Sequence, residues 1–170
     1  MSTARAGVSV RDARVQDLPG LTAIYNHVIM ESTAVFSETP VTLEERTAWW
    51  QTRTAQGYPV LVAIDAAEVA GFATFGDFRT WPGYRYTVEH TVHVRAARRG
   101  SGVGHALMLE LFTRAVALGK HMMIAGIDAA NTGSIRFHER LGFVCAGVLH
   151  EVGFKFGRRL DLQLMQRRLG

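Results

Sequence analysis

The chain reads Arg99-Gly100-Ser101-Gly102-Val103-Gly104 between a strand pattern over residues 84–94 and an apolar helical pattern that runs from about Gly102 to Leu118. In a strand, glycine turn and helix of this order, the main-chain N–H groups of the turn converge with the positive end of the helix dipole. Glycine suits such a turn because it tolerates positive φ and lets an anion approach the backbone. We therefore expect a phosphate group to bind at residues 100–104.

Two familiar phosphate-binding loops do not fit this stretch. A Walker A loop ends in Gly-Lys-Ser or Gly-Lys-Thr, whereas this chain has Gly104-His105-Ala106. A dinucleotide fingerprint needs a third glycine where His105 stands. The phosphate expected here is therefore not held by either nucleotide motif, and the alternative is a plain strand-to-helix turn without a ligand.

The strand pattern over residues 84–94 has two different faces. Its odd positions form a mostly polar row, and its even positions are mostly apolar: Arg85, Thr87, Glu89, Thr91 and His93 against Tyr84, Tyr86, Val88, His90, Val92 and Val94. A strand so apolar on one face is typical of a sheet interior, so the polar row predicts a cleft beside the sheet. The alternative is that this row is simply solvated.

A second polar group follows in Asn131-Thr132-Gly133-Ser134-Ile135-Arg136-Phe137-His138. Spacings of three and four place Asn131, Ser134 and His138 along one side of a short helix over residues 132–141. Taken singly, Asn131 is an ordinary N-cap and His138 an ordinary packed histidine. Together they predict a polar stripe.

The remaining patterns complete one α/β domain over residues 1–170. A capping box, Thr42-x-x-Glu45, opens a helix, and the apolar run 60–64 with 68–78 predicts an antiparallel hairpin. The other expected elements are strands at 8–12, 121–127, 143–149 and 160–166 and a helix ending near Met30. We expect Cys145 to be core.

Composition excludes several classes of protein. Among 170 residues, 48% are hydrophobic and 20% charged, which suits a folded globule. There is no apolar run long enough for a membrane span and no apolar signal-like core at the start, so we expect no membrane contact and a cytoplasmic location. One cysteine makes no disulfide and no cysteine-based zinc site, so no metal is expected. The net charge of +4 is scattered, so nucleic acid is not expected as a partner.

The glycine turn and the Asn131 segment together resemble the acetyl-coenzyme A binding core of the GNAT-superfamily N-acetyltransferases. Residues 86–94, Phe137-His138-Glu139 and Gly153-Phe154-Lys155-x-Gly157 resemble the phosphinothricin and methionine sulfoximine N-acetyltransferase branch. The resemblance implies a GNAT-like fold, a mixed and mostly antiparallel twisted sheet flanked by helices. It also implies acetyl-CoA as co-substrate and a homodimer.

The resemblance also assigns residues to acetyl-CoA. The turn, including Ser101 and Val103, would hold the pyrophosphate through the amides of Gly100 to Gly104, with Arg99 nearby. The pantetheine arm would pair with the strand at Val92, His93 and Val94, and Asn131 and Ser134 would contact it further along. His138 stands where many members place a tyrosine acid, so its part as acid, base or positioning group stays open.

Transfer of acetyl to an amine needs a base, because an α-amine is mostly protonated at pH 7. Glu89 is the candidate, since apolar and aromatic neighbours should raise its pKa. An N–H at a bulge in residues 91–94 would stabilise the oxyanion, and His138 would stabilise or protonate the departing thiolate.

The acceptor is expected to be a small amino-acid analogue of the phosphinothricin, methionine sulfoximine or methionine sulfone class. Arg79 and Arg85 flank the Trp81-Pro82-Gly83 turn, and a guanidinium suits a carboxylate. The resemblance favours Arg79 for that task and Phe36 as a pocket wall. The alternatives are a protein N-terminus or an antibiotic amine as acceptor, a coenzyme A-binding sensor without turnover, and a nucleic-acid module.

Overall fold

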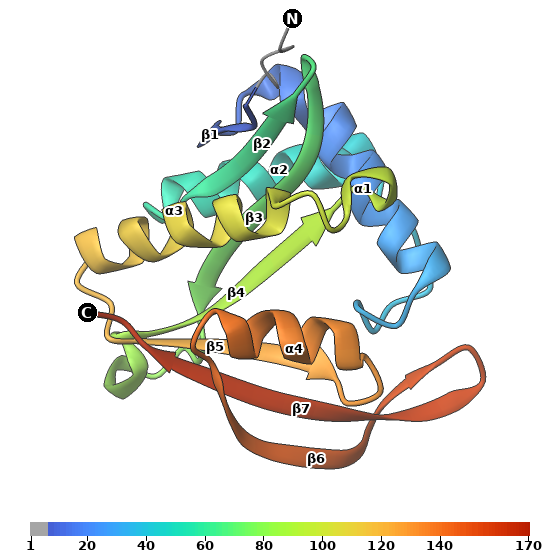
Figure 1. Cartoon of the computed structure of the whole chain (residues 1–170), viewed down its shortest axis with the longest axis vertical. Coiled ribbons are helices and arrows are strands. Elements are labelled where there is room, and N and C mark those ends of the chain that lie inside the picture. Colours follow the sequence, from blue (N-terminus) through green and yellow to red (C-terminus); the bar gives the residue numbers. More distant parts are fainter. Residues whose placement is uncertain (1–6) are drawn as a thin grey trace, which may run out of the picture.

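The computed structural model describes residues 7–170, which form one seven-stranded sheet with helices on both faces (Figure 1). The strands lie in the order β1-β2-β3-β4-β5-β7-β6, and all neighbouring pairs are antiparallel except the parallel pair β4 and β5. The strands are β1 (Ser9–Asp12), β2 (Val60–Asp65), β3 (Glu68–Asp77), β4 (Thr87–Val94), β5 (Met122–Asp128), β6 (Val144–Lys155) and β7 (Arg158–Arg168). The helices are α1 (Leu18–Glu31), α2 (Leu43–Ala55), α3 (Val103–Ala117) and α4 (Thr132–Arg140). The mixed, mostly antiparallel fold expected from the sequence is confirmed.

Both faces of the sheet are covered, as the continuous apolar run of β2 predicts. Leu61 and Ala63 pack into a core with α3 and α4, whereas Val60 and Val62 pack into a second core with α1. Successive side chains of a strand point to opposite faces, so each of these four residues is buried. None of the helices within residues 7–170 has the length and apolar character needed to cross a membrane.

The sheet opens between β4 and β5. Their parallel pairing covers only Thr87–Glu89 against Met122–Ile124, and beyond Glu89 the two strands diverge (Figure 1). On its other side β4 stays paired with β3 from Val88 to Val94 without a register shift. The bulge expected at residues 91–94 is therefore wrong. The free edge of β4 arises because β5 moves away from it.

Two further expectations on the strands need correction. The strand pattern over residues 84–94 begins as a strand only at Thr87, because Pro82–Tyr84 forms a 3₁₀ turn. Tyr84 and Tyr86 are consequently exposed rather than part of a buried face.

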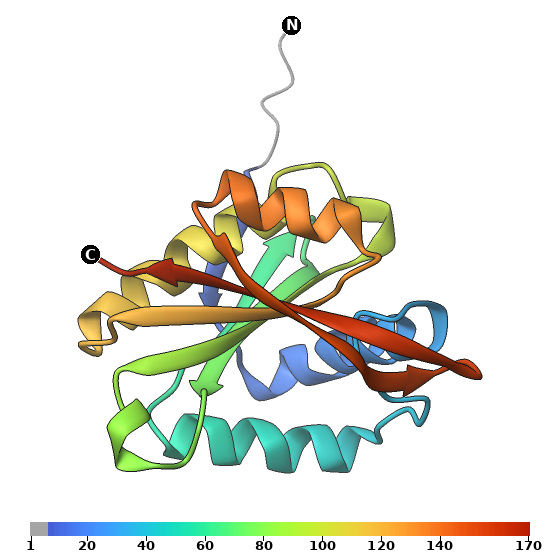
Figure 2. The same ribbon diagram turned by 90° about the horizontal axis from the view of Figure 1, so that it is seen from below.

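The C-terminal hairpin is longer than predicted and extends past the rest of the sheet (Figure 2). Cys145 lies on its edge strand, β6, and is exposed, so the expectation of a core cysteine is wrong. The apolar neighbours that suggested burial, such as Val144 and Leu149, are exposed as well, because no further strand or helix of the described chain covers this side.

The capping box is confirmed at the start of α2. Glu45 Oε2 accepts a hydrogen bond from the N–H of Thr42 at 2.7 Å, and Thr42 Oγ1 accepts one from the N–H of Glu45 at 3.1 Å. This reciprocal pair satisfies amide groups that have no partner within the helix. Helix α2 then lies beside α1 on the same face of the sheet (Figure 2).

Candidate active site

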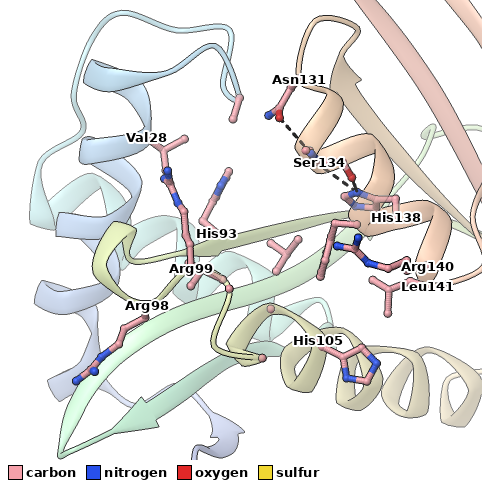
Figure 3. A pocket seen from close by; sticks show the side chains of 18 of the residues that line it. Val28, His93, Arg98, Arg99, His105, Asn131, Ser134, His138, Arg140 and Leu141 are labelled. Carbon is pink, nitrogen blue, oxygen red and sulfur yellow. Dashed lines mark hydrogen bonds between the residues drawn. The ribbon is translucent and has the colours of Figure 1, made fainter.

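A cavity of about 600 Å³ opens beside the free edge of β4, between the turn before α3 and the start of α4 (Figure 3). It collects most of the residues assigned to acetyl-CoA from the sequence: Val92, His93, Val94, Arg99, Gly100, Gly102, Gly104, Asn131 and Ser134. His138 lies on its wall as well. Ser101 and Val103 do not line it, because the Ser101 hydroxyl donates to the Arg98 carbonyl at 2.6 Å and Val103 is buried in the core.

The glycines of the turn serve two different purposes. Gly100 and Gly102 have φ of 74° and 89°, in the region that favours glycine, and Gly102 is the N-cap of α3. Gly104 instead allows a close approach of helices, because a Cβ there would lie 3.3 Å from the Phe137 ring of α4. The turn thereby presents the free N–H groups of the α3 start to the cavity, which is the geometry of an anion site.

Basic side chains lie at this end of the cavity. Arg98, Arg99, His105 and Arg140 line it from the turn, α3 and α4 (Figure 3). Arg98 is already paired with Asp65 at 3.1 Å. The arginine side chains and the helix dipole together favour a polyanionic group such as a diphosphate.

The polar stripe of α4 forms as predicted, and hydrogen bonds link its three residues (Figure 3). Asn131 is the N-cap, because its Oδ1 accepts from the N–H of Ser134 at 3.1 Å. His138 Nδ1 lies 2.7 Å from the Ser134 carbonyl oxygen. A carbonyl oxygen only accepts, so Nδ1 of His138 carries the proton.

His138 has a second partner, His90 of β4. Their Nε2 atoms lie 3.1 Å apart and the rings stack with centroids 5.1 Å apart. Burial lowers the pKa of both histidines, so the neutral forms prevail at neutral pH. The contact between the two rings was not anticipated from the sequence, because His90 sits on the apolar face of the strand pattern.

A second cavity, of about 310 Å³, lies on the other side of His93 and contains Glu89. It shares Ala34, Val92, His93, Asn131, Ser134 and His138 with the first cavity, so the two meet along β4. The Glu89 carboxyl group lies over Gly126 of β5, where a Cβ would stand 3.1 Å from Oε1. Burial raises the pKa of Glu89, and the positive charge of Arg79 opposes this rise.

The four residues expected to bind the acceptor do not line either cavity. Trp81 is 74% exposed, and the guanidinium of Arg85 donates to the Pro82 carbonyl. Arg79 is exposed, donates to the Phe78 carbonyl, and reaches Glu89 only through its charge. Phe36 packs its ring on Gly153 of β6, behind the cavity wall.

Several residues at the cavities were missed. Tyr25, Val35 and Asp128 line the second cavity, and Arg46 is buried behind His93. The Arg46 guanidinium lies 3.6 Å from the Trp49 ring centroid and 4.0 Å from that of Tyr25. Burial and the nearby charge of Arg46 lower the pKa of His93 to about 4. For Tyr25 and Arg46 no signal is visible in the sequence, because α1 and α2 have ordinary amphipathic patterns.

No metal site is expected from the sequence. Within residues 7–170, no three or more His, Cys, Asp or Glu side chains gather in a way that could hold a metal ion.

Comparison with known proteins defines the class of this fold and site. Residues 21–143 match the Acetyltransferase (GNAT) family, so the chain belongs to this family of N-acetyltransferases, which use acetyl-CoA. The glycine turn, the free edge of β4 and the Asn131 segment all line one cavity.

Two curated relatives narrow the comparison. The L-methionine sulfoximine/L-methionine sulfone acetyltransferase of Pseudomonas aeruginosa is 53% identical over 162 residues, 95% of this chain and 94% of the relative. The phosphinothricin N-acetyltransferase of Alcaligenes faecalis is 41% identical over 167 residues, 98% of this chain and 85% of the relative.

Two solved structures have the same fold with the coenzyme bound. An acetyltransferase of Salmonella typhimurium with its cofactor acetyl-CoA is 42% identical, with a TM-score of 0.93 over 97% of this chain and 95% of that one. A phosphinothricin acetyltransferase of Sinorhizobium meliloti in complex with acetyl-CoA is 40% identical, with a TM-score of 0.92 over 96% and 89%.

Proposed function

We propose that the chain transfers acetyl from acetyl-CoA to the α-amino group of a small amino-acid analogue of the methionine sulfoximine, methionine sulfone or phosphinothricin class. The observation that carries this proposal is the junction of the two cavities along β4, with Glu89 in the smaller one. A volume of about 310 Å³ is at the lower end of small-molecule sites and suits an amino acid. The names of the relatives support the substrate class.

In this mechanism the larger cavity holds the coenzyme. The N–H groups of residues 100–104 and Arg99 bind its diphosphate, and the unpaired edge of Val92, His93 and Val94 binds its extended arm. Bound acetyl-CoA supplies the acetyl group as a thioester. Correct placement of the two reactants is expected to contribute most to the rate, because juxtaposition can lower the reaction barrier more than proton transfer does.

Glu89 is the proposed general base. Its raised pKa brings the carboxylate nearer to the range where it can take a proton from an ammonium group, directly or through water. The deprotonated amine then attacks the thioester carbon; the C–N bond forms and the C–S bond breaks. The coenzyme A thiolate leaves and is neutralised by the second proton that the nitrogen loses or by a solvent proton, while the proton on Glu89 passes to solvent. Main-chain N–H groups on the free edge of β4, where β5 has diverged, are the proposed donors to the oxygen that gains charge.

His138 has a positioning part in this proposal. Its Nδ1–H is engaged by the Ser134 carbonyl and its Nε2 by His90. In the neutral pair its Nε2 has no proton to give, and the lowered pKa of both rings disfavours an additional one. We therefore assign proton removal from the amine to Glu89.

Arg79 is the proposed partner for the carboxylate or oxyanion of the acceptor, since its charge already acts on Glu89. Phe36 acts behind the pocket wall. For Trp81 and Arg85 a role in binding stays a prediction, because both lie on the exposed turn before β4.

The test is release of free thiol from acetyl-CoA with a panel of amines: methionine sulfoximine, methionine sulfone, phosphinothricin, the common amino acids, a peptide with a free N-terminus and an aminoglycoside. We expect turnover with the first three. Glu89→Gln should lower kcat about 10²- to 10⁴-fold while the KM for acetyl-CoA stays unchanged. Turnover only with the peptide or the aminoglycoside would contradict the substrate class, and coenzyme binding without any turnover would indicate a sensor.

We further propose that the protein lies in the cytosol, where acetyl-CoA is made and Cys145 stays reduced. We also propose that it forms a homodimer. The support for a dimer is the exposed apolar surface of β6, formed by Val144, Val148, Leu149, Val152 and Phe154. Val152→Glu should reduce the mass measured by light scattering to that of a monomer. The matched control is Val15→Glu, because Val15 is 64% exposed on a separate 3₁₀ turn near the start of the chain. A wild-type monomer would contradict the dimer.

A further inference from the structure

Lys155, at the end of β6, is fully buried and reaches across to the end of α1. Its ammonium group donates to three main-chain carbonyls, those of Ile29 at 2.6 Å, Ser32 at 2.6 Å and Val35 at 2.7 Å. The Ile29 carbonyl belongs to the last turn of α1, where carbonyls lack partners within the helix and a cation is favoured. All three donors of the ammonium are therefore used on one short segment of chain.

That segment, the loop of residues 32–36 after α1, is held at two more points. Phe36 packs on Gly153 so closely that a Cβ on Gly153 would lie 2.4 Å from the ring. On the other side the Thr33 hydroxyl donates to the buried carboxylate of Asp128 at the end of β5. The loop is thus attached to β6 through Lys155 and Phe36 and to β5 through Thr33.

The same loop forms the wall of both cavities. Ser32 and Ala34 line the coenzyme cavity, and Ala34 and Val35 line the cavity that contains Glu89. The Val35 carbonyl is one of the three that Lys155 holds. Lys155 therefore holds the main chain of a wall that both cavities share.

A lysine is suited to this task. Its ammonium offers three donors on a slender stem, whereas a guanidinium is planar and larger. Replacement by methionine would keep the volume and remove the donors, leaving three buried carbonyls without their partner. The contacts of Phe36 and Thr33 then hold only the two ends of the loop, so its middle, at Ala34 and Val35, is free to move.

We propose that Lys155 is a positioning residue for the acceptor: by holding the loop of residues 32–36 against β6, it sets the shape of the amine cavity and hence the selectivity for the amine. This inference rests on the proposed function, because the cavity with Glu89 is taken as the acceptor site. Lys155 itself does not line either cavity and acts through the loop.

The experiment compares wild type with Lys155→Met, measuring KM and kcat for methionine sulfoximine and for acetyl-CoA separately. We expect the KM for the amine to rise about tenfold or more. The KM for acetyl-CoA should rise much less, because the turn of residues 100–104 and the edge of β4, which Lys155 does not hold, also line the coenzyme cavity. The preference for methionine sulfoximine over smaller amino acids should also decrease. Hydrogen exchange should become faster at the amides of residues 32–36.

Lys120→Met is the matched control, because Lys120 is the other lysine of the chain and also donates to a main-chain carbonyl, that of Arg85 at 2.7 Å. It lies before the start of β5, at the opposite end of this strand from Asp128. We expect its ratio of the two KM values to equal that of wild type.

Gly153→Ala is a second variant in case Lys155→Met does not fold, since it displaces Phe36 and leaves the ammonium in place. Equal changes in both KM values, or an unchanged ratio in the variants that fold, would contradict the role of Lys155. A wild-type enzyme that acetylates none of the amines would instead contradict the proposed function.

Discussion

The Nε2 atoms of His90 on β4 and His138 on α4 lie 3.1 Å apart, and this contact fixes which ring nitrogens carry protons. His138 Nδ1 donates to the Ser134 carbonyl, so in the neutral ring its Nε2 is an acceptor. His90 must then donate from Nε2, which leaves its Nδ1 as a lone pair. That atom is buried without a hydrogen-bond partner among the described residues.

The first prediction concerns these tautomers. Long-range proton–nitrogen NMR correlation at pH 7.5 should show His138 protonated at Nδ1 and His90 protonated at Nε2. His90→Phe removes the donor, and the His138 signals should then move while the Nδ1 proton stays. A spectrum with the proton of His138 on Nε2 would contradict the arrangement and would restore His138 as a proton donor to the thiolate.

The second prediction concerns stability in acid. His93 has a pKa of about 4 in the folded protein and an ordinary value of 6.5, so below pH 6.5 the unfolded chain binds this proton more readily. Above pH 6.5 neither state binds it and there is no effect. As the pH falls from 6.5 toward 4, folding stability is lost at about 1.4 kcal/mol per pH unit.

His93→Phe removes this group and keeps a ring between Tyr25 and Phe72, which both contact it. Between pH 7.5 and pH 5 the free energy of unfolding should therefore fall by about 2 kcal/mol less in the variant than in wild type. Urea denaturation at the two pH values measures this. An identical pH dependence in both proteins would show that His93 titrates normally.

The third prediction concerns Arg79. Its positive charge lowers the pKa of Glu89 against the larger effect of burial. In Arg79→Met the pKa of Glu89 should rise further, and a base with a higher pKa loses its proton only at higher pH. The acidic limb of the pH profile of kcat/KM should therefore move to higher pH.

Arg85→Met is the control for this shift, because it removes an exposed arginine on the other side of the Trp81 turn. The Arg85 guanidinium donates to the Pro82 carbonyl, and Arg79 is the arginine whose charge acts on Glu89. The acidic limb in Arg85→Met should coincide with that of wild type. A limb that moves to lower pH in Arg79→Met would mean that Glu89 is not the group observed.

The sequence predicted the parts of the site that are local in the chain. The glycine turn, the Asn131 cap and the alternation around Glu89 each depend on neighbours within a few residues, and the structure brings them to one pair of cavities. The bulge in β4 was wrong because the free edge depends on where β5 diverges, which no local pattern records.

The residues that were missed depend on distant contacts. Lys155 reaches α1 across more than a hundred residues, and His90 meets His138 across a different pair of elements. Cys145 was placed in the core because its strand is apolar, yet that strand is the sheet edge. Apolar character indicates burial against some surface but does not tell whether that surface belongs to the same chain.

A glycine with positive φ can be required to avoid backbone strain, to present N–H groups to a ligand, or for both reasons. Gly102 and Gly57 have φ of 89° and 79°, and a Cβ on either would meet no atom within 4 Å. Alanine at either position should therefore cost about 1 kcal/mol of folding stability through backbone strain alone. Only Gly102 precedes the helix that presents N–H groups to the coenzyme cavity, since Gly57 follows α2.

Gly102→Ala should consequently raise the KM for acetyl-CoA about tenfold, which corresponds to about 1.4 kcal/mol of binding, because relief of the strain turns the N–H groups away from the diphosphate. Gly57→Ala should leave that KM unchanged, and it should lower the melting temperature about as much as Gly102→Ala does. If both variants lose stability equally and neither changes the KM for acetyl-CoA, the turn before α3 does not bind the diphosphate, because the strain has then been introduced at that turn without any effect on the ligand.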